Sequence, residues 1–299
     1  MRIEKISSEY DGLGLEIAIS VPVELPKGIV QFSHGMAEHK ERYFGFMNYL
    51  SDQGYICVIH DHRGHGESVE DKSDYGFFYT EDEQAIIDDL HTVTKLIKNR
   101  YPDIPLYLFS HSMGTLVARG YLKKYDDEID KIVLCGPPTY NSAANMGLTL
   151  AKLSKPFHKE KAPNQMLNRL AFKGFNDGNE VSNGWLSVNP FNVEAYNDDP
   201  KCGFVFTTNG FINLFKLQKG AFETTGWQVK QPKLPIFVIA GEVDPVIGSK
   251  EKFGELIKFL NNVGYSNVKS KLYFGMRHEI LNEFGIAEVY EDTLSFFEE

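Results

Sequence analysis

Residues 106–119, LYLFSHSMGTLVAR, combine the residue types and the spacing that nucleophilic catalysis needs. The pattern predicts an apolar strand that ends in a sharp turn and continues as a helix, with Ser112 at the apex. In such a nucleophile elbow the turn lifts the hydroxyl clear of the sheet, and the helix N-terminus faces the ligand. The positions two before and two after the serine must be small, and Ser110 and Gly114 meet this requirement. The pattern is therefore S-x-S-x-G in place of G-x-S-x-G.

A serine hydroxyl needs a general base, and the base needs an acid to orient it. In elbows of this kind the partners follow in the order serine, acid, histidine. Asp244, in AGEVDPV, and His278, in FGMRHE, each come directly after a late predicted strand. Active-site residues gather beyond the carboxyl ends of parallel strands, so these positions suit the two roles. Glu242 lies two residues before Asp244 and stays open as the rival acid.

Backbone N–H groups that stabilise an oxyanion are the third requirement of this chemistry. The loop HGMAEH, residues 34–39, follows an early predicted strand, and Gly35 lets the backbone turn tightly there. We expect the N–H of Met36 and the N–H of Met113, directly after the serine, to form the oxyanion hole.

Strand-like and helix-like segments alternate along the chain and are expected to position these residues. The first segments, residues 3–8 and 13–21, predict a hairpin around Asp11-Gly12. Buried strands are expected at residues 28–33, 55–59, 106–109, 131–135, 235–240 and 269–274. Helices are expected at residues 42–53, 83–100, 113–125, 251–262 and 286–297. This alternation predicts an α/β fold whose mostly parallel sheet is covered by helices on both faces.

Residues 137–227 break this rhythm, and their length is too great for a simple loop. We interpret them as a helical insertion, the cap segment, between the two halves of an α/β core at residues 1–136 and 228–299. Amphipathic stretches are expected at residues 146–157 and 204–222. In the second stretch, Phe211, Leu214 and Phe215 share one side of a helix and are expected to line a pocket for an acyl chain.

Four segments together resemble the α/β-hydrolases of the monoacylglycerol lipase and lysophospholipase-like family, which overlaps the serine aminopeptidase type. They are residues 34–39 (HGMAEH), 61–68 (DHRGHGES), 110–114 (SHSMG) and 277–283 (RHEILNE). The resemblance implies the α/β-hydrolase fold, hydrolysis of carboxylic esters, no cofactor and a mobile cap that forms the acyl pocket. Ser110 departs from the family, which usually has glycine there.

Composition excludes several other classes of function. The net charge of −10 argues against nucleic acid as a partner. No apolar run approaches the roughly 20 residues that span a bilayer, and the charged N-terminus does not resemble a secretion signal. Three cysteines without metal-ligand spacing favour reduced thiols in a cytoplasmic protein without a metal. The histidines of residues 61–68 are three apart in a glycine-rich loop, which favours a structural loop beside the site.

The expected function is therefore that of a cytoplasmic serine ester hydrolase, with Ser112, Asp244 and His278 as its triad. The expected partner is a small acyl ester, most simply a monoacylglycerol, with at most transient contact between the cap segment and a membrane. A lysophospholipase, an acyltransferase, an aminopeptidase-type amide hydrolase and a non-catalytic ligand-binding relative remain alternatives. An aminopeptidase needs acidic groups that hold a substrate amine, and the cap segment offers Asp177, Glu180, Glu194, Asp198 and Asp199.

Overall fold

A single eight-stranded sheet forms the centre of the computed structural model, which describes residues 1–299. The strands are β1 (Arg2–Ser7), β2 (Gly14–Ser20), β3 (Gly28–Ser33), β4 (Tyr55–His60), β5 (Leu106–His111), β6 (Lys131–Cys135), β7 (Ile236–Gly241) and β8 (Val268–Tyr273). Their order in the sheet is β1-β2-β4-β3-β5-β6-β7-β8, and only β2 runs antiparallel to its neighbours. The predicted hairpin and mostly parallel sheet are confirmed.

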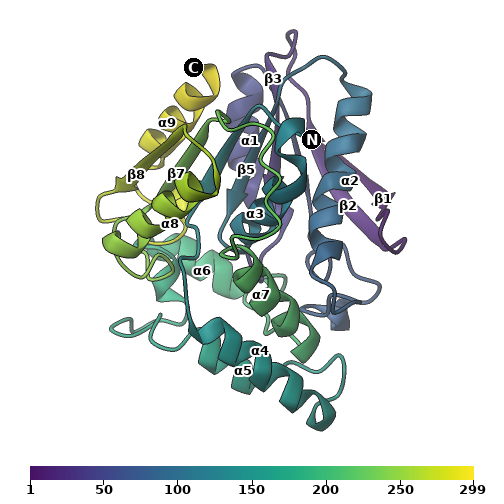
Figure 1. The fold of residues 1–299 in the computed structure, drawn as a ribbon, viewed down its shortest axis with the longest axis vertical. Helices are drawn as coiled ribbons and strands as arrows, with labels where there is room; N and C mark the ends of the chain where they lie inside the picture. Colours follow the sequence, from purple (N-terminus) through teal and green to yellow (C-terminus); the bar gives the residue numbers. More distant parts are fainter.

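Helices cover both faces of the sheet (Figure 1), as the sequence predicts. The helices outside the cap segment are α1 (Phe44–Asp52), α2 (Gln84–Arg100), α3 (Met113–Tyr125), α8 (Lys250–Val263) and α9 (Ile286–Glu298). α1 and α9 pack on one face, and α2, α3 and α8 pack on the other. Every residue of β3, β4, β5 and β7 is buried, which explains their unbroken apolar runs.

The chain between β6 and β7 adds no strand to the sheet and folds into four helices at one end of it (Figure 1). These are α4 (Ala143–Ser154), α5 (Gln165–Ala171), α6 (Pro190–Asp198) and α7 (Thr208–Gly220). α4 packs against α7, which matches the two amphipathic stretches expected there.

The sequence analysis missed α5 and α6, although both begin with a recognisable capping residue. The Asn164 side chain accepts a hydrogen bond from the N–H of Leu167, and the Asn189 side chain accepts one from the N–H of Phe191. Pro190 after Asn189 is a further start signal. Both helices are shorter than three turns, so neither has a periodicity that stands out from its surroundings.

Two predicted helices begin later than expected. α1 starts at Phe44 because residues 40–43 form a 3₁₀ turn. α7 starts at Thr208, since the Thr207 hydroxyl caps the helix by accepting a hydrogen bond from the N–H of Gly210. No helix combines the length and the apolar character needed to cross a membrane.

Candidate active site

Ser112 occupies a strained turn between β5 and α3. Its backbone has φ +51° and ψ −120°, a conformation that costs a non-glycine residue free energy. A Cβ at position 114 would lie 2.1 Å from the Ser33 carbonyl oxygen, so only glycine allows α3 to start this close to β3. Ser110 fits because its hydroxyl donates a hydrogen bond to the Val133 carbonyl of β6, at 2.9 Å. The elbow predicted from the S-x-S-x-G pattern is therefore present.

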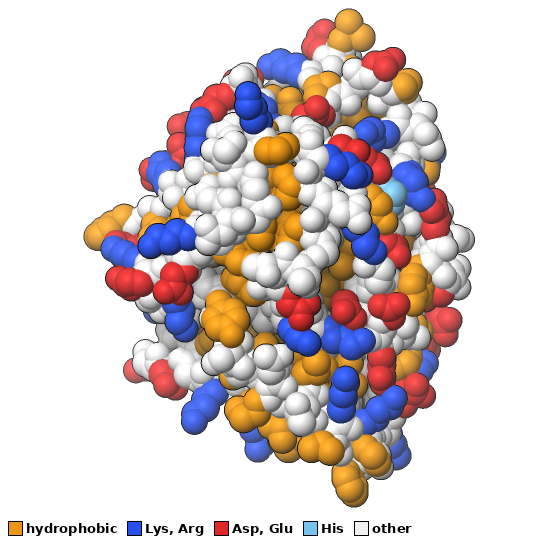
Figure 2. Space-filling view, in the orientation of Figure 1, with side chains coloured by type: hydrophobic (Ala, Val, Ile, Leu, Met, Phe, Trp, Pro, Cys, Tyr) orange, Lys and Arg blue, Asp and Glu red, His pale blue; other side chains and the backbone are white.

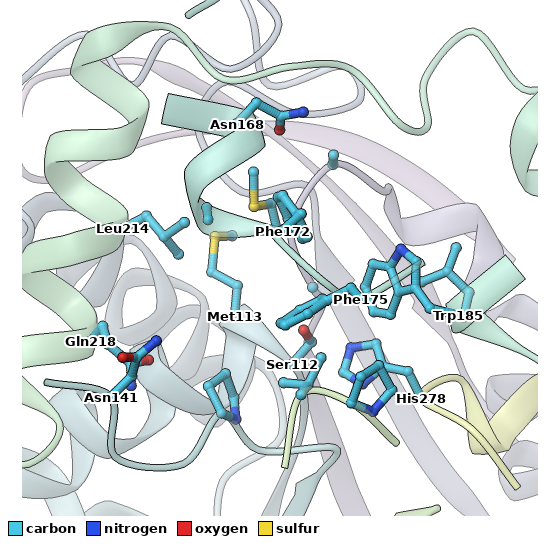
Figure 3. A pocket seen from close by; sticks show the side chains of 18 of the residues that line it. Ser112, Met113, Asn141, Asn168, Phe172, Phe175, Trp185, Leu214, Gln218 and His278 are labelled. Atoms are coloured by element: carbon cyan, nitrogen blue, oxygen red, sulfur yellow. The ribbon is translucent and has the colours of Figure 1, made fainter. Parts of the chain in front are cut away.

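His278 and Asp244 come together from the loops that follow β8 and β7. His278 Nδ1 lies 2.8 Å from Asp244 Oδ2, and both side chains are buried. The other carboxylate oxygen of Asp244 accepts a hydrogen bond from the N–H of Val246, which fixes its orientation. No hydrogen bond joins Ser112 to His278, but both residues line one cavity and lie side by side in Figure 3. Such catalytic contacts often tighten only when substrate binds.

Glu242, the rival acid, points away from His278. Its carboxylate lies 2.5 Å from the Lys250 ammonium group and also accepts a hydrogen bond from the N–H of Gly275. The geometry therefore pairs the histidine with Asp244 alone.

The loop after β3 brings Met36 beside the elbow. The N–H of Met36 makes no hydrogen bond within the protein, and the N–H of Met113 is at the first position of α3, where no helical acceptor exists. Both residues line the cavity that contains Ser112. A Cβ at Gly35 would lie 3.1 Å from the Ser112 Cβ, so glycine permits the close approach.

Glu38 and His111 form a buried pair that the sequence analysis did not identify. The Glu38 carboxylate accepts hydrogen bonds from the Gly35 N–H and the Tyr43 hydroxyl, and it lies 3.2 Å from His111 Nδ1. His111 Nε2 lies 3.3 Å from the His278 carbonyl oxygen. Burial by itself lowers the pKa of His111, but the Glu38 carboxylate outweighs it and raises that pKa. The pair thus connects the Met36 loop to the His278 loop.

A cavity of about 570 Å³ opens above Ser112 and is enclosed by the cap segment. Phe175 and Trp185 stand beside Ser112 and His278, with Phe172 just beyond them, while Leu214 and Gln218 of α7 lie on the opposite side (Figure 3). These three aromatic residues were not predicted. Their helix and turns lack the periodicity that marked α7.

The structure corrects one of the three predicted pocket residues. Leu214 and Phe215 line the cavity, but Phe211 does not. Phe211 is fully buried between the rings of Phe206 and Phe215, with centroids 5.8 and 6.0 Å away. The apolar face of α7 extends beyond the cavity, and Phe211 lies in the part of that face that packs against the protein interior.

The acidic side chains of the cap segment are not arranged to hold an amine. None of the five that the sequence offers lines the cavity. Glu38 and Glu279 do line it, but Glu38 is bonded within its own loop and Glu279 is paired with the Arg42 guanidinium at 2.7 Å. Lys252 is the only lysine or arginine among the lining residues.

Two sites that contain histidine invite a metal hypothesis, and neither supports it. His39 lies near Asp199 and Cys202, but its two ring nitrogens already face the carboxylates of Glu41 and Asp199. Burial alone lowers the pKa of His39, yet these carboxylates raise it, which favours an imidazolium with no free lone pair. The 61–68 loop brings no three potential ligand atoms together, and its Asp61 accepts a hydrogen bond from the buried Lys40 ammonium group at 2.7 Å.

The sheet, the elbow and the histidine–aspartate pair define an α/β-hydrolase. Residues 24–284 match the family described as Serine aminopeptidase, S33, and the chain belongs to that family.

Two relatives and one solved structure illustrate the similarity. The Monoacylglycerol lipase of Mycolicibacterium smegmatis is 26% identical, over 99% of this chain and 96% of the relative. The Monoglyceride lipase of Mus musculus is 26% identical, over 91% of this chain and 82% of the relative. A crystal structure of a thermostable carboxyl esterase from Bacillus coagulans, in complex with glycerol, superposes with a TM-score of 0.91 at 27% identity, covering 99% of this chain and 97% of that one.

Proposed function

We propose that this chain is a serine hydrolase that cleaves carboxylic esters, with Ser112 as nucleophile, His278 as general base and Asp244 as the acid that orients the base. One observation carries the proposal. His278, held by Asp244 at 2.8 Å, lines the same cavity as a serine on a strained strand-to-helix turn. A serine with an adjacent base, and a third group orienting that base, is the arrangement that activates a hydroxyl.

The mechanism follows from these positions. Ser112 Oγ attacks the ester carbonyl carbon while His278 Nε2 takes the hydroxyl proton, and the carbonyl electrons move onto the oxygen. The N–H groups of Met36 and Met113 hold that oxyanion. When this tetrahedral intermediate collapses, the alcohol leaves and takes the proton from His278. The acyl group stays bonded to Ser112 as an acyl-enzyme. Water activated by His278 then releases the acid, while Asp244 holds the Nδ1–H throughout.

A neutral ester with a medium or long acyl chain, such as a monoacylglycerol, is the substrate that we propose. Phe172, Phe175, Leu214 and Phe215 supply apolar walls for an acyl chain. A single lysine in the lining offers little for a phosphate, which favours monoacylglycerol over lysophospholipid. The relatives named for monoacylglycerol support the same choice.

We propose that residues 137–227 act as a cap that touches lipid transiently while substrate enters. Hydrophobic side chains gather over the end of the molecule where α4 and α5 lie, with Lys and Arg side chains among them (Figure 2). Leu153 is 65% exposed and Phe157 is 86% exposed, although both are apolar. A cytoplasmic location suits the three cysteines, which are all free thiols.

Replacing Ser112 by alanine tests the proposal directly. The Ser112→Ala variant should lose about 10⁶ in kcat for monoacylglycerol hydrolysis, as triad serines do. It should also no longer react with a fluorophosphonate probe, and its circular dichroism should match the wild type. Hydrolysis within tenfold of the wild type would refute the assignment. Rates on lysophosphatidylcholine and on aminoacyl anilides, measured in parallel, would identify a phospholipase or a peptidase.

A further inference from the structure

The Met36 loop is held from two sides, and only one of them belongs to the α/β core. On the core side, His34 Nδ1–H donates to the Gly35 carbonyl at 2.8 Å, while the His62 N–H donates to His34 Nε2 and fixes this tautomer. The Glu38 carboxylate also accepts the Gly35 N–H. These bonds anchor the chain just before Met36, and the side chain of Ala37, the residue after it, packs into the hydrophobic core.

The backbone carbonyl of Ala37 is held by the segment that contains α6. Its carbonyl oxygen accepts the Tyr196 hydroxyl at 2.9 Å and the Gly203 N–H at 2.9 Å. Ala37 has φ +52°, a left-handed conformation that an alanine adopts only when its surroundings impose it. These two hydrogen bonds contribute to that constraint, together with the core packing of its side chain.

Tyr196 is itself fixed, so its hydroxyl is a rigid donor. It is 7% exposed, and the Arg42 guanidinium lies 4.8 Å from its ring centroid. Both terminal nitrogens of Arg42 bind the Glu279 carboxylate at 2.7 Å, next to His278 in the chain. Asn192 of α6 also donates to Glu279, at 2.6 Å. The same arginine therefore joins the Met36 loop, the His278 loop and α6.

We propose that Tyr196 is a positioning residue for the oxyanion hole. With the Gly203 N–H it holds the Ala37 peptide so that the N–H of Met36 faces the Ser112 adduct. The inference rests on the proposed function and extends it, because it makes α6 a part of the catalytic framework. A displacement of α6 would therefore move the Ala37 carbonyl and, through the adjoining backbone, the N–H of Met36.

The Tyr196→Phe variant keeps the ring beneath Arg42 and removes only the hydroxyl. Deleting an oxyanion donor outright costs about 10²–10³ in kcat, and loosening one should cost less, about tenfold. The loss should appear equally in kcat and kcat/KM of p-nitrophenyl butyrate hydrolysis, with KM unchanged, because the interaction is made in the transition state. A rise in KM at constant kcat would overturn the proposal and show direct contact with substrate.

Tyr265→Phe is the matched control. Tyr265 is also buried, and its hydroxyl donates to Asp126 at 3.1 Å, outside the cavity. Both variants should lower the unfolding midpoint, since each loses a buried hydrogen bond, but only Tyr196→Phe should lower kcat. Equal kcat in both variants would overturn the proposal.

A trifluoromethyl ketone with a butyl chain provides a second readout. The Ser112 oxygen bonds to the ketone carbon, the hydroxyl proton goes to His278, and the carbonyl oxygen becomes an oxyanion in the hole. Its inhibition constant should rise in Tyr196→Phe by the same factor by which kcat falls, and unchanged affinity would contradict the proposal. Ser112→Ala belongs in the same assay. If Ser112→Ala is inactive while Tyr196→Phe equals the wild type, the inference alone fails, whereas an active Ser112→Ala refutes the proposed function.

Discussion

At the level of single side chains, the contacts of two neighbouring carboxylates favour Asp244 over Glu242 as the proposed acid. Asp244 and Glu242 are two residues apart, and both carry a carboxylate close to the end of β7. Asp244 is buried against His278 with a second bond to a backbone N–H, whereas Glu242 pairs with Lys250 at the surface. A buried carboxylate held by two hydrogen bonds keeps the imidazole in one tautomer, and an acid paired elsewhere cannot.

The two carboxylates should therefore respond very differently to conversion into amides. Asp244→Asn should lower kcat by about 10⁴, as in other triads, because the amide favours the wrong histidine tautomer. Glu242→Gln should leave kcat within about twofold. Ester hydrolysis by the two purified variants measures both effects, and a larger loss in Glu242→Gln would reverse the assignment.

Ser110 explains how the elbow tolerates a departure from glycine. Its hydroxyl is buried and satisfied by the β6 backbone, so the serine contributes to stability and not to chemistry. Ser110→Gly should lower the free energy of unfolding by about 1–2 kcal/mol, from the lost hydrogen bond and the added backbone freedom. Urea denaturation measures this loss, and kcat should stay unchanged. A large fall in kcat without loss of stability would instead place Ser110 in the reaction.

At the scale of elements, α7 has residues that line the cavity and residues that do not. Leu214 lines the cavity, while Lys216 faces outward and pairs with Glu83 at 3.1 Å. Each buried methylene contributes about 0.8 kcal/mol, so two more acyl carbons favour catalysis by about tenfold until the pocket is full. We expect kcat/KM to rise from acetate to an intermediate chain length and then to level off.

A charge on the cavity side of α7 should reduce the dependence of kcat/KM on acyl chain length. Leu214→Asp should depress kcat/KM for long esters far more than for acetate, because a desolvated carboxylate beside the chain is costly. Lys216→Gln on the same helix should leave the profile as in the wild type. Rates on p-nitrophenyl esters from C2 to C16, below the micellar limit, measure both. An equal effect of Leu214→Asp on all lengths would mean that the acyl chain lies elsewhere.

For the molecule as a whole, four buried histidines beside the Met36 loop link stability to pH. Burial lowers the pKa of His60 to about 3 and that of His65 to about 4, and it also lowers the pKa values of His34 and His62. In the unfolded chain these groups titrate near the ordinary value of about 6.5. Below pH 6.5 the unfolded state binds more protons than the folded state. The free energy of unfolding is therefore highest above about pH 6.5, and it falls as the pH drops towards the lowered pKa values of the folded protein.

His60 allows a test, since neither of its ring nitrogens has a hydrogen-bond partner. As the pH falls below 6.5, one such histidine lowers the free energy of unfolding by about 1.4 kcal/mol per pH unit, or by about 2 kcal/mol between pH 6.5 and 5. His60→Phe removes this titrating group. Between pH 6.5 and 5, the variant should therefore lose about 2 kcal/mol less free energy of unfolding than the wild type loses. Urea unfolding at the two pH values checks this. The same acid-induced loss in both proteins would show that His60 is not responsible.

Local patterns along the chain were enough to predict the sheet and the elbow, and they led to the proposed order of the triad. A buried strand, a sharp turn and an amphipathic helix each depend on residues within a few positions of one another, so their signals are present in the sequence. The positions of Asp244 and His278 follow because the carboxyl ends of parallel strands share one edge of the sheet.

Only the tertiary structure decided which side chains meet across long distances in the chain. Whether Phe211 or Leu214 faces the cavity depends on how α7 is rotated against α3 and α4. The bond from Tyr196 to Ala37 joins residues 159 positions apart, and the contact between Glu38 and His111 joins residues 73 positions apart. Such pairs have no periodicity or spacing of their own, because the path of the backbone, and not the neighbouring sequence, brings their atoms together.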